Sequence, residues 1–192
     1  MGAHIEWPQN KHDAPVWVTI GNGADEILKD GYLTAILKGH AIQTVGVMLD
    51  ADTKPKGRYG QIRHLCRGMF PSLPDEIPEA GLIVDNDDEK RLGVWIMPDN
   101  SSDGGIETFL KYLVPNKSES QWVLANECVA RARGIGAECR EAHVEKANLF
   151  TWLAWQDPPG QYPGIALSKK ILDPHAASAA AFVAWFRALY RL

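Results

Sequence analysis

The stretch Val45-Gly46-Val47-Met48-Leu49-Asp50-Ala51-Asp52 decides the fold class, because an apolar run here ends in two aspartates. A short apolar run of this kind indicates a buried strand. Two carboxylates at the carboxyl end of a central strand place negative oxygens side by side, which suits a hard cation. The simpler alternative is that one aspartate caps the next loop while the other is merely exposed. Like charges seldom end a buried strand without a cation, which favours a metal site.

The composition is that of an ordinary globular protein of 192 residues, with 45% hydrophobic and 23% charged residues. A formal net charge of −4 argues against a chain that coats nucleic acid by bulk charge. The negative charge does not exclude an active site that binds a phosphodiester through metal ions, because bound cations reverse the local field. The three cysteines lack C-x-x-C spacing and, with no signal peptide, favour a cytoplasmic location. No apolar run is long enough for a bilayer, so no membrane partner is expected.

Strand and helix patterns alternate on both sides of the opening stretch. Strands are predicted at residues 16–20, 44–49, 81–85 and 92–97, with an acidic hairpin turn between the last two. Helices are predicted at residues 24–38, 59–70, 106–114, 119–133, 144–156 and 176–192. This order predicts an α/β fold with a mostly parallel sheet flanked by helices. We expect an α/β core over residues 1–116 and a helical C-terminal part over residues 117–192, packed together as one domain.

Further oxygen-bearing side chains follow the strand predicted at residues 92–97. Asp99 and Asn100 come directly after it, and Glu107 lies in the first turn of the next helix. Each has a local alternative, since Asp and Asn favour turns and an acidic residue favours a helix amino terminus. Together with Asp50 and Asp52 they predict a magnesium-type site at one sheet edge. Four basic side chains follow the two aspartates: Lys54, Lys56, Arg58 and Arg63. They either contact phosphates beside the metal site or form a solvated face of the loop and helix.

Other familiar motifs are missing from the chain. The six histidines are scattered without H-E-x-x-H spacing, and His64 is only a weak candidate for the site. Gly21-Asn22-Gly23 lacks the lysine of a P-loop and is read as a plain turn, and no G-x-S-x-G is present. A receiver-like phosphoacceptor fold is a weaker possibility. It needs an acidic pair after the first strand and a lysine at a later strand end, and neither is visible in this sequence.

Three motifs together resemble a Toprim-type domain: Leu49-Asp50-Ala51-Asp52, Trp95-Ile96-Met97-Pro98-Asp99-Asn100 and Gly105-Ile106-Glu107-Thr108-Phe109-Leu110. The chain is most similar to the bacterial domain-of-unknown-function family 3226, which the segment FTWLAWQ at residues 150–156 also resembles. The resemblance implies binding of Mg²⁺ or Mn²⁺ and action on phosphodiesters. It implies that Asp50 and Asp52 are metal ligands and catalytic, that Glu107 completes the site, and that Asp99 lines the same edge.

One feature of the Toprim pattern is missing from this sequence. The pattern begins with a strand that ends in a glutamate, usually followed by glycine, and Glu6 is the only acidic residue before Asp13. Either the chain begins after that strand and helix, or this member has lost the glutamate and is catalytically weak or inert.

Two functions are therefore expected from the sequence. The first is a Mg²⁺-dependent nuclease or phosphoryl-transfer domain that acts on DNA or RNA. The alternative is a non-catalytic Toprim-like binding or regulatory module that works with a partner such as an ATPase, an analogy with related nucleases alone.

Overall fold

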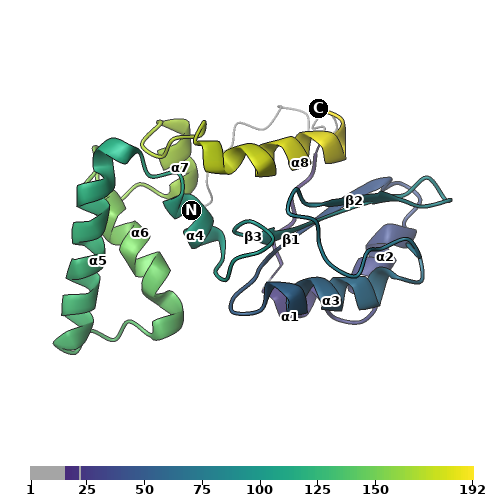
Figure 1. Cartoon of the computed structure of the whole chain (residues 1–192), viewed down its shortest axis with the longest axis horizontal. Helices are drawn as coiled ribbons and strands as arrows, with labels where there is room; N and C mark the ends of the chain where they lie inside the picture. Colours follow the sequence, from purple (N-terminus) through teal and green to yellow (C-terminus); the bar gives the residue numbers. More distant parts are fainter. Residues whose placement is uncertain (1–15, 22) are drawn as a thin grey trace. The chain divides into compact units, whose positions relative to one another are not determined.

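The computed structural model describes residues 16–21 and 23–192. The expectation about a first-strand glutamate concerns residues that lie outside this described part. The chain divides into two compact units. One, the sheet unit, comprises the described residues up to Ile106 together with Ala181–Leu192. The other, the helical unit, comprises Glu107–Ala180. In chain order, the elements of both units (Figure 1) are α1 (Ala24–Ile27), α2 (Tyr32–Lys38), β1 (Thr44–Asp50), α3 (Pro55–Cys66), β2 (Leu82–Asp85), β3 (Arg91–Met97), α4 (Ile106–Lys111), α5 (Glu119–Gly134), α6 (Val144–Ala154), α7 (Pro163–Ser168) and α8 (Ala180–Tyr190), with short 3₁₀ turns at Asn116–Ser118, Glu141–His143 and Ala177–Ala179.

The sheet of the described residues has three strands in the order β1-β3-β2. β1 and β3 are parallel, with Gly46 opposite Gly93 and Asp50 opposite Met97. β2 and β3 are antiparallel, as the predicted hairpin requires. The Asn86 side chain shapes that turn, since its Oδ1 accepts the backbone N–H groups of Asp88 and Lys90. The α/β class is confirmed, and the sheet is mixed.

The strand predicted at residues 16–20 is wrong. Within the described part of the chain this segment pairs with no strand. Trp17, Val18 and Ile20 are 64%, 61% and 90% exposed. The β-preference of such residues comes from packing on a half-buried sheet surface, and here they have no such surface.

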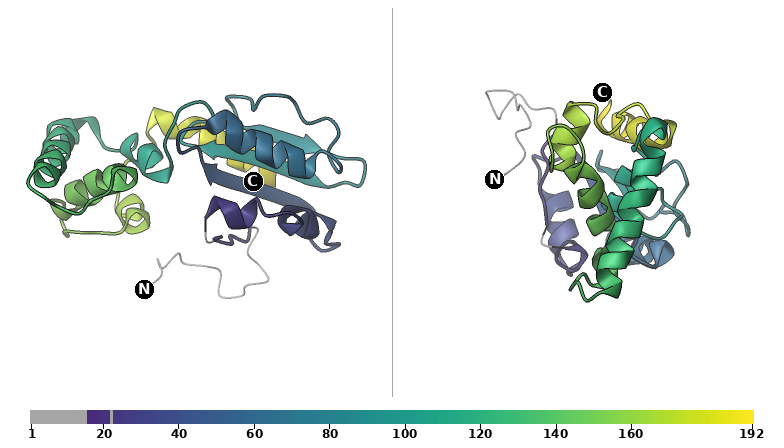
Figure 2. Two further views of the ribbon diagram at one scale, coloured as in Figure 1. Left: turned by 90° about the horizontal axis from the view of Figure 1, so that it is seen from below. Right: turned by 90° about the vertical axis from the view of Figure 1, so that its left-hand side faces the viewer.

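Helices cover both faces of the sheet, α3 on one side and α8 on the other (Figures 1 and 2). The α3 face holds the main core, because alternate residues of β1 and β3 point toward the same side. Its fully or nearly buried members are Leu33, Leu37, Val47, Leu49, Ala51, Tyr59, Ile62, Cys66, Phe70, Leu73, Leu82, Leu92, Val94 and Ile96. The helix predicted at residues 24–38 is divided into α1 and α2, with a left-handed turn at Gly31 (φ 87°) between them.

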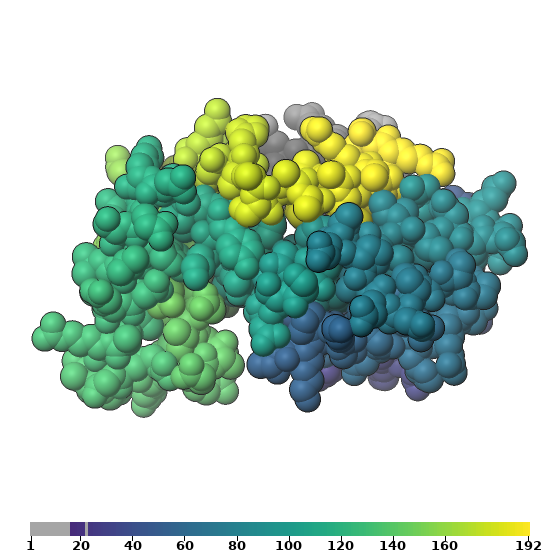
Figure 3. Space-filling model, viewed as in Figure 1, coloured from purple at the N-terminus to yellow at the C-terminus, as the bar shows by residue number. Residues whose placement is uncertain are grey.

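The C-terminal helix α8 packs on the opposite face against Trp95 of β3. The Trp95 ring centroid lies 5.4 Å from that of Phe182 and 5.6 Å from that of Trp185. The Trp185 indole also donates to the Leu82 carbonyl at 2.9 Å. A methyl group added at Gly93 would lie 2.4 Å from Leu189, so glycine is what lets α8 approach. The C-terminal residues therefore lie directly on this unit (Figure 3).

The helical unit is built on an antiparallel pair formed by α5 and α6, which correspond to the helices predicted at residues 119–133 and 144–156. Leu149, Trp152 and Leu153 of α6 are fully buried, and Trp122 and Trp152 meet edge to face at 6.3 Å. The loop after α6 leads into α7, which the sequence did not predict because proline and glycine dominate its start. No helix in the described part of the chain combines the length and the apolar character that crossing a membrane requires.

Candidate functional site

The carboxyl ends of β1 and β3 lie side by side, because these strands are parallel and in register to their last residues. Asp50 ends β1, and Asp99 follows shortly after β3. The loop from Ser101 to Gly105 then passes the same edge, since Asp52 and Gly104 form an isolated antiparallel bridge. The Asp50 side chain and the Asp52 backbone therefore both contact the Gly104-Gly105 segment, while a shared cation between the two carboxylates stays a prediction.

Asp50 is in direct contact with the residues that begin α4. Its Oδ1 accepts the backbone N–H of Ile106 at 2.9 Å. A methyl group added at Gly105 would lie only 2.7 Å from Asp50 Cγ. The loop therefore closes on the carboxylate at a distance that only glycine permits. An acid in this place also stabilises a helix amino terminus, so Asp50 has a structural role whatever else it does.

Asp52 is held by its backbone and by a cation. Its N–H and C=O both bond to Gly104, at 2.8 Å and 2.7 Å, and its φ of 54° is left-handed. Its carboxylate Oδ2 lies 2.6 Å from the Arg58 guanidinium, while the Asp52 side chain is 64% exposed and that of Arg58 is 22% exposed. The pair puts one negative and one positive group beside the loop that Asp50 contacts.

The other basic residues of α3 are also matched with acids. Lys56 pairs with Glu76 at 2.7 Å, and Arg63 pairs with Asp75 at 2.6 Å. Exposed pairs of this kind contribute little to stability. Their predicted contact with phosphates stays a prediction.

Asp99 and Asn100 organise the turn after β3. Asp99 accepts the backbone N–H and the hydroxyl of both Ser101 and Ser102. Partial burial acts to raise the pKa of Asp99, but these hydrogen bonds outweigh it and hold the pKa below its usual value. Asn100 is 5% exposed, accepts the Ile96 N–H at 2.7 Å and donates to the Glu79 carbonyl at 3.1 Å. Both side chains are engaged in closing the strand end.

Glu107 lies in the first turn of α4 and belongs to the helical unit. A glutamate there interacts favourably with the helix dipole. Within residues 16–21 and 23–192, no group of three or more Asp, Glu, His or Cys side chains is arranged to enclose a metal ion. Catalytic and metal-binding roles for Asp50, Asp52, Asp99 and Glu107 stay predictions.

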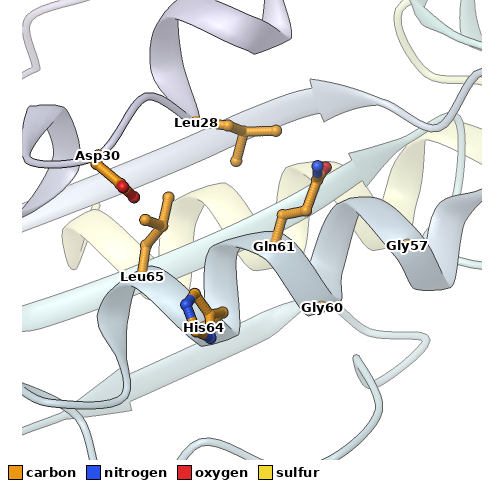
Figure 4. A pocket seen from close by; sticks show the side chains of 7 residues that line it. All are labelled: Leu28, Asp30, Gly57, Gly60, Gln61, His64 and Leu65. Atoms are coloured by element: carbon orange, nitrogen blue, oxygen red, sulfur yellow. The ribbon is translucent and has the colours of Figure 1, made fainter.

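A shallow cavity of about 350 Å³ lies elsewhere in the sheet unit, between α3 and the residues that follow α1 (Figure 4). Asp30, Gln61 and His64 provide its polar groups, and Gly57 and Gly60 leave the surface of α3 open there. His64 therefore lines this cavity, which contains none of the predicted metal ligands.

The sequence did not predict the contact of Asp50 with Gly105 or the pairing of Arg58 with Asp52. A glycine before a helix has many explanations, and only the folded chain shows Asp50 against it. The Arg58 partnership was open to prediction, because Arg58 lies six residues after Asp52 and one turn into α3.

The fold and site define a mixed α/β protein. At the carboxyl end of its parallel strand pair, the side chain of Asp50 and the backbone of Asp52 contact the Gly104-Gly105 loop. The family described as "Protein of unknown function (DUF3226)" matches residues 2–191, so the chain belongs to this family. No curated protein and no solved structure matches the chain.

Proposed function

We propose that this protein is a Toprim-like, Mg²⁺-dependent phosphoryl-transfer protein, a nuclease that acts on DNA or RNA in the bacterial cytoplasm. One observation carries the proposal. Asp50 and Asp52 converge on the Gly104-Gly105 backbone at the carboxyl end of β1, beside parallel β3. In open α/β sheets, ligands bind at this end of the strands. The mixed sheet would be the core of a Toprim-like, Rossmann-related domain.

The donor set fits Mg²⁺ or Mn²⁺ better than a cation that needs a full protein cage. Magnesium is usually bound through one or two carboxylates and keeps waters and substrate phosphates as its other ligands. Asp50 and Asp52 would hold the ion, and Asp99 and Glu107 are proposed as further ligands. When bound, the ion polarises the phosphodiester and activates water.

The chain's own residues would position the site. The Ile106 N–H orients Asp50 at 2.9 Å, and the two Gly104 bonds fix the backbone of Asp52. Arg58 keeps a guanidinium 2.6 Å from Asp52, from which it would contact a phosphate oxygen of the substrate. Glu107 is proposed as the acid that completes catalysis.

The test is cleavage of single- and double-stranded DNA and RNA with Mn²⁺ or Mg²⁺ by the wild type, Asp50→Asn and Asp52→Asn. We expect both variants to lose cleavage while the control Asp85→Asn keeps it. Asp85 is a matched control, because it is also an aspartate that ends a strand of the same sheet and pairs with an arginine. It lies opposite Arg91 at the start of β3, the far end from Asp50. Cleavage that survives loss of both aspartates would refute the metal-site proposal.

A second function is favoured by the bonds that the two acids already make. Asp50 binds the start of α4 and Asp52 binds Arg58, so both carboxylates have structural work without an ion. The alternative is a non-catalytic module that serves a partner protein such as an ATPase. A wild type that cleaves nothing, with Asp50→Asn less stable to urea, would support this alternative.

A further inference from the structure

The α5–α6 pair of the helical unit contains four buried polar side-chain atoms that have no hydrogen-bond partner within the described part of the chain. They are the indole Nε1 atoms of Trp122 and Trp152 and the amide Oδ1 atoms of Asn126 and Asn148. Trp152, Trp122 and Asn148 are only 0%, 4% and 7% exposed. Buried polar groups in native proteins almost always have a partner, which is protein or ordered water. Four such atoms in one helix pair need a common explanation.

The four residues recur at the same spacing on the two helices. Trp122 and Asn126 are four residues apart on α5, while Asn148 and Trp152 are four apart on α6 in the reverse order. Residues with this spacing lie on one face of a helix, one above the other. The helices run side by side, joined by the segment at residues 135–143 (Figures 1 and 2).

The tryptophan contact fixes the register. Trp122 and Trp152 meet with ring centroids 6.3 Å apart. Helix geometry then implies that Asn126 and Asn148, each one turn nearer the connecting segment, lie opposite each other. The interface therefore has an indole layer followed by an amide layer, with two donors in the first and two acceptors in the second.

We infer that one ordered water molecule binds between the two layers. A water donates two hydrogen bonds, here to the two Asn Oδ1 atoms, and accepts two, here from the two indole N–H groups. Buried waters typically make two to four hydrogen bonds to groups that would otherwise be unsatisfied. An ammonium ion only donates and a chloride ion only accepts, so neither satisfies both layers. The chemistry of the four atoms selects water.

The water would also give the helix pair its register. Sliding α6 by one turn along α5 would separate the four groups and leave buried donors and acceptors unpaired, which apolar side chains alone would not penalise. A single buried polar contact is known to select register in helix pairs in this way.

The test is nuclear magnetic resonance on the full chain labelled with ¹⁵N, measuring cross-relaxation between water and indole N–H protons. We expect Trp122 and Trp152 to show cross-peaks to a long-lived bound water. Trp185 is the internal control, because it is also buried but donates to the Leu82 carbonyl at 2.9 Å. We expect no such cross-peak from Trp185. Absence of the cross-peaks from both Trp122 and Trp152 would overturn the inference.

A variant locates the water. Asn126→Leu combined with Asn148→Leu removes both acceptors, so both cross-peaks should disappear while the Trp185 indole signal stays in place. Gln121→Leu, an exposed change on the same α5, should leave the cross-peaks unchanged. Cross-peaks that persist in the folded double variant would place the water elsewhere and contradict the proposed site.

Discussion

The Asp50 side chain lies directly against the backbone of Gly105 at the candidate site. The Asp50 carboxylate binds a backbone N–H that lies 56 residues later in the chain, so the contact ties a strand end to a helix start. Because Gly105 has no Cβ, the backbone can lie against the carboxylate. This residue pair therefore determines both the position of Asp50 and where α4 begins.

Replacing Gly105 by alanine should disturb this contact. The added Cβ would lie 2.7 Å from Asp50 Cγ, so the loop or the carboxylate must shift. Overpacking of this kind costs about 1–3 kcal/mol of unfolding free energy, which urea denaturation measures. Gly60→Ala is the control, since nothing lies within 4 Å of a Cβ there, and it should gain about 0.5–1 kcal/mol within α3. Equal stability of the two variants would contradict the contact.

The hydrogen bonds to Asp99 should make stability depend on pH. They hold the pKa of Asp99 below its usual value in the folded state, despite partial burial that raises it. A lowered folded pKa means that the stabilisation is fully present above the unfolded pKa, about 3.9, and is lost as pH falls through the folded pKa. The difference in unfolding free energy between wild type and Asp99→Asn should therefore shrink as pH falls from about 6 to about 2. A difference that does not change with pH would contradict this.

At the scale of elements, the C-terminal helix α8 covers the face of the sheet opposite to α3. Trp185 packs on Trp95 at 5.6 Å and bonds Leu82, so it joins α8 to both β2 and β3. Local sequence predicted α8 as a helix from its apolar spacing. It could not predict which face of the sheet α8 covers. The close approach of Leu189 to Gly93 is visible only in the folded chain.

Truncation of Trp185 should therefore weaken the sheet unit. Trp185→Ala removes a side chain that is 3% exposed and leaves a cavity on Trp95, at a cost of about 3–5 kcal/mol in urea unfolding. Val183→Ala, at a position on α8 that is 39% exposed, should change stability by about 0.5 kcal/mol or less. Similar losses for both variants would show that α8 is not anchored through Trp185.

The elements that the sequence predicted well are those with strong local patterns. The buried strand before Asp50 and the helices α5 and α6 follow from apolar runs and helical spacing. Residues 16–20 have an equally strong β composition, yet they pair with no described strand. Pairing is a non-local property, so composition alone cannot decide it.

At the scale of the whole molecule, the cysteines report on the two units separately. Cys66 lies in the sheet-unit core with 0% exposure, while Cys128 is exposed on α5 of the helical unit. Burial raises the pKa of the Cys66 thiol to about 11, so it is protonated at neutral pH. With a thiol reagent at about pH 8, Cys128 should react at once and Cys66 only when the sheet unit opens. Mass spectrometry of the labelled peptides measures this, and equally fast labelling of Cys66 would contradict the buried core.

The candidate site could be predicted only in part. The Asp50–Asp52 pair was visible, because both acids follow one apolar strand. The Gly105 contact was not, because its partner is distant in sequence. The turn-closing contacts of Asp99 and Asn100 match the local alternative for these residues, since Asp and Asn favour turns. Acids at a strand end serve structure and metal binding alike, and sequence does not separate the two roles.

Isothermal titration calorimetry of the full chain with Mn²⁺ tests the central claim that Asp50 and Asp52 bind a divalent cation. We predict that the wild type and Asp85→Asn bind one ion with similar affinity. We predict that Asp50→Asn and Asp52→Asn each weaken binding at least about tenfold. Binding that is absent in the wild type, or that is unchanged in both site variants, would contradict the claim.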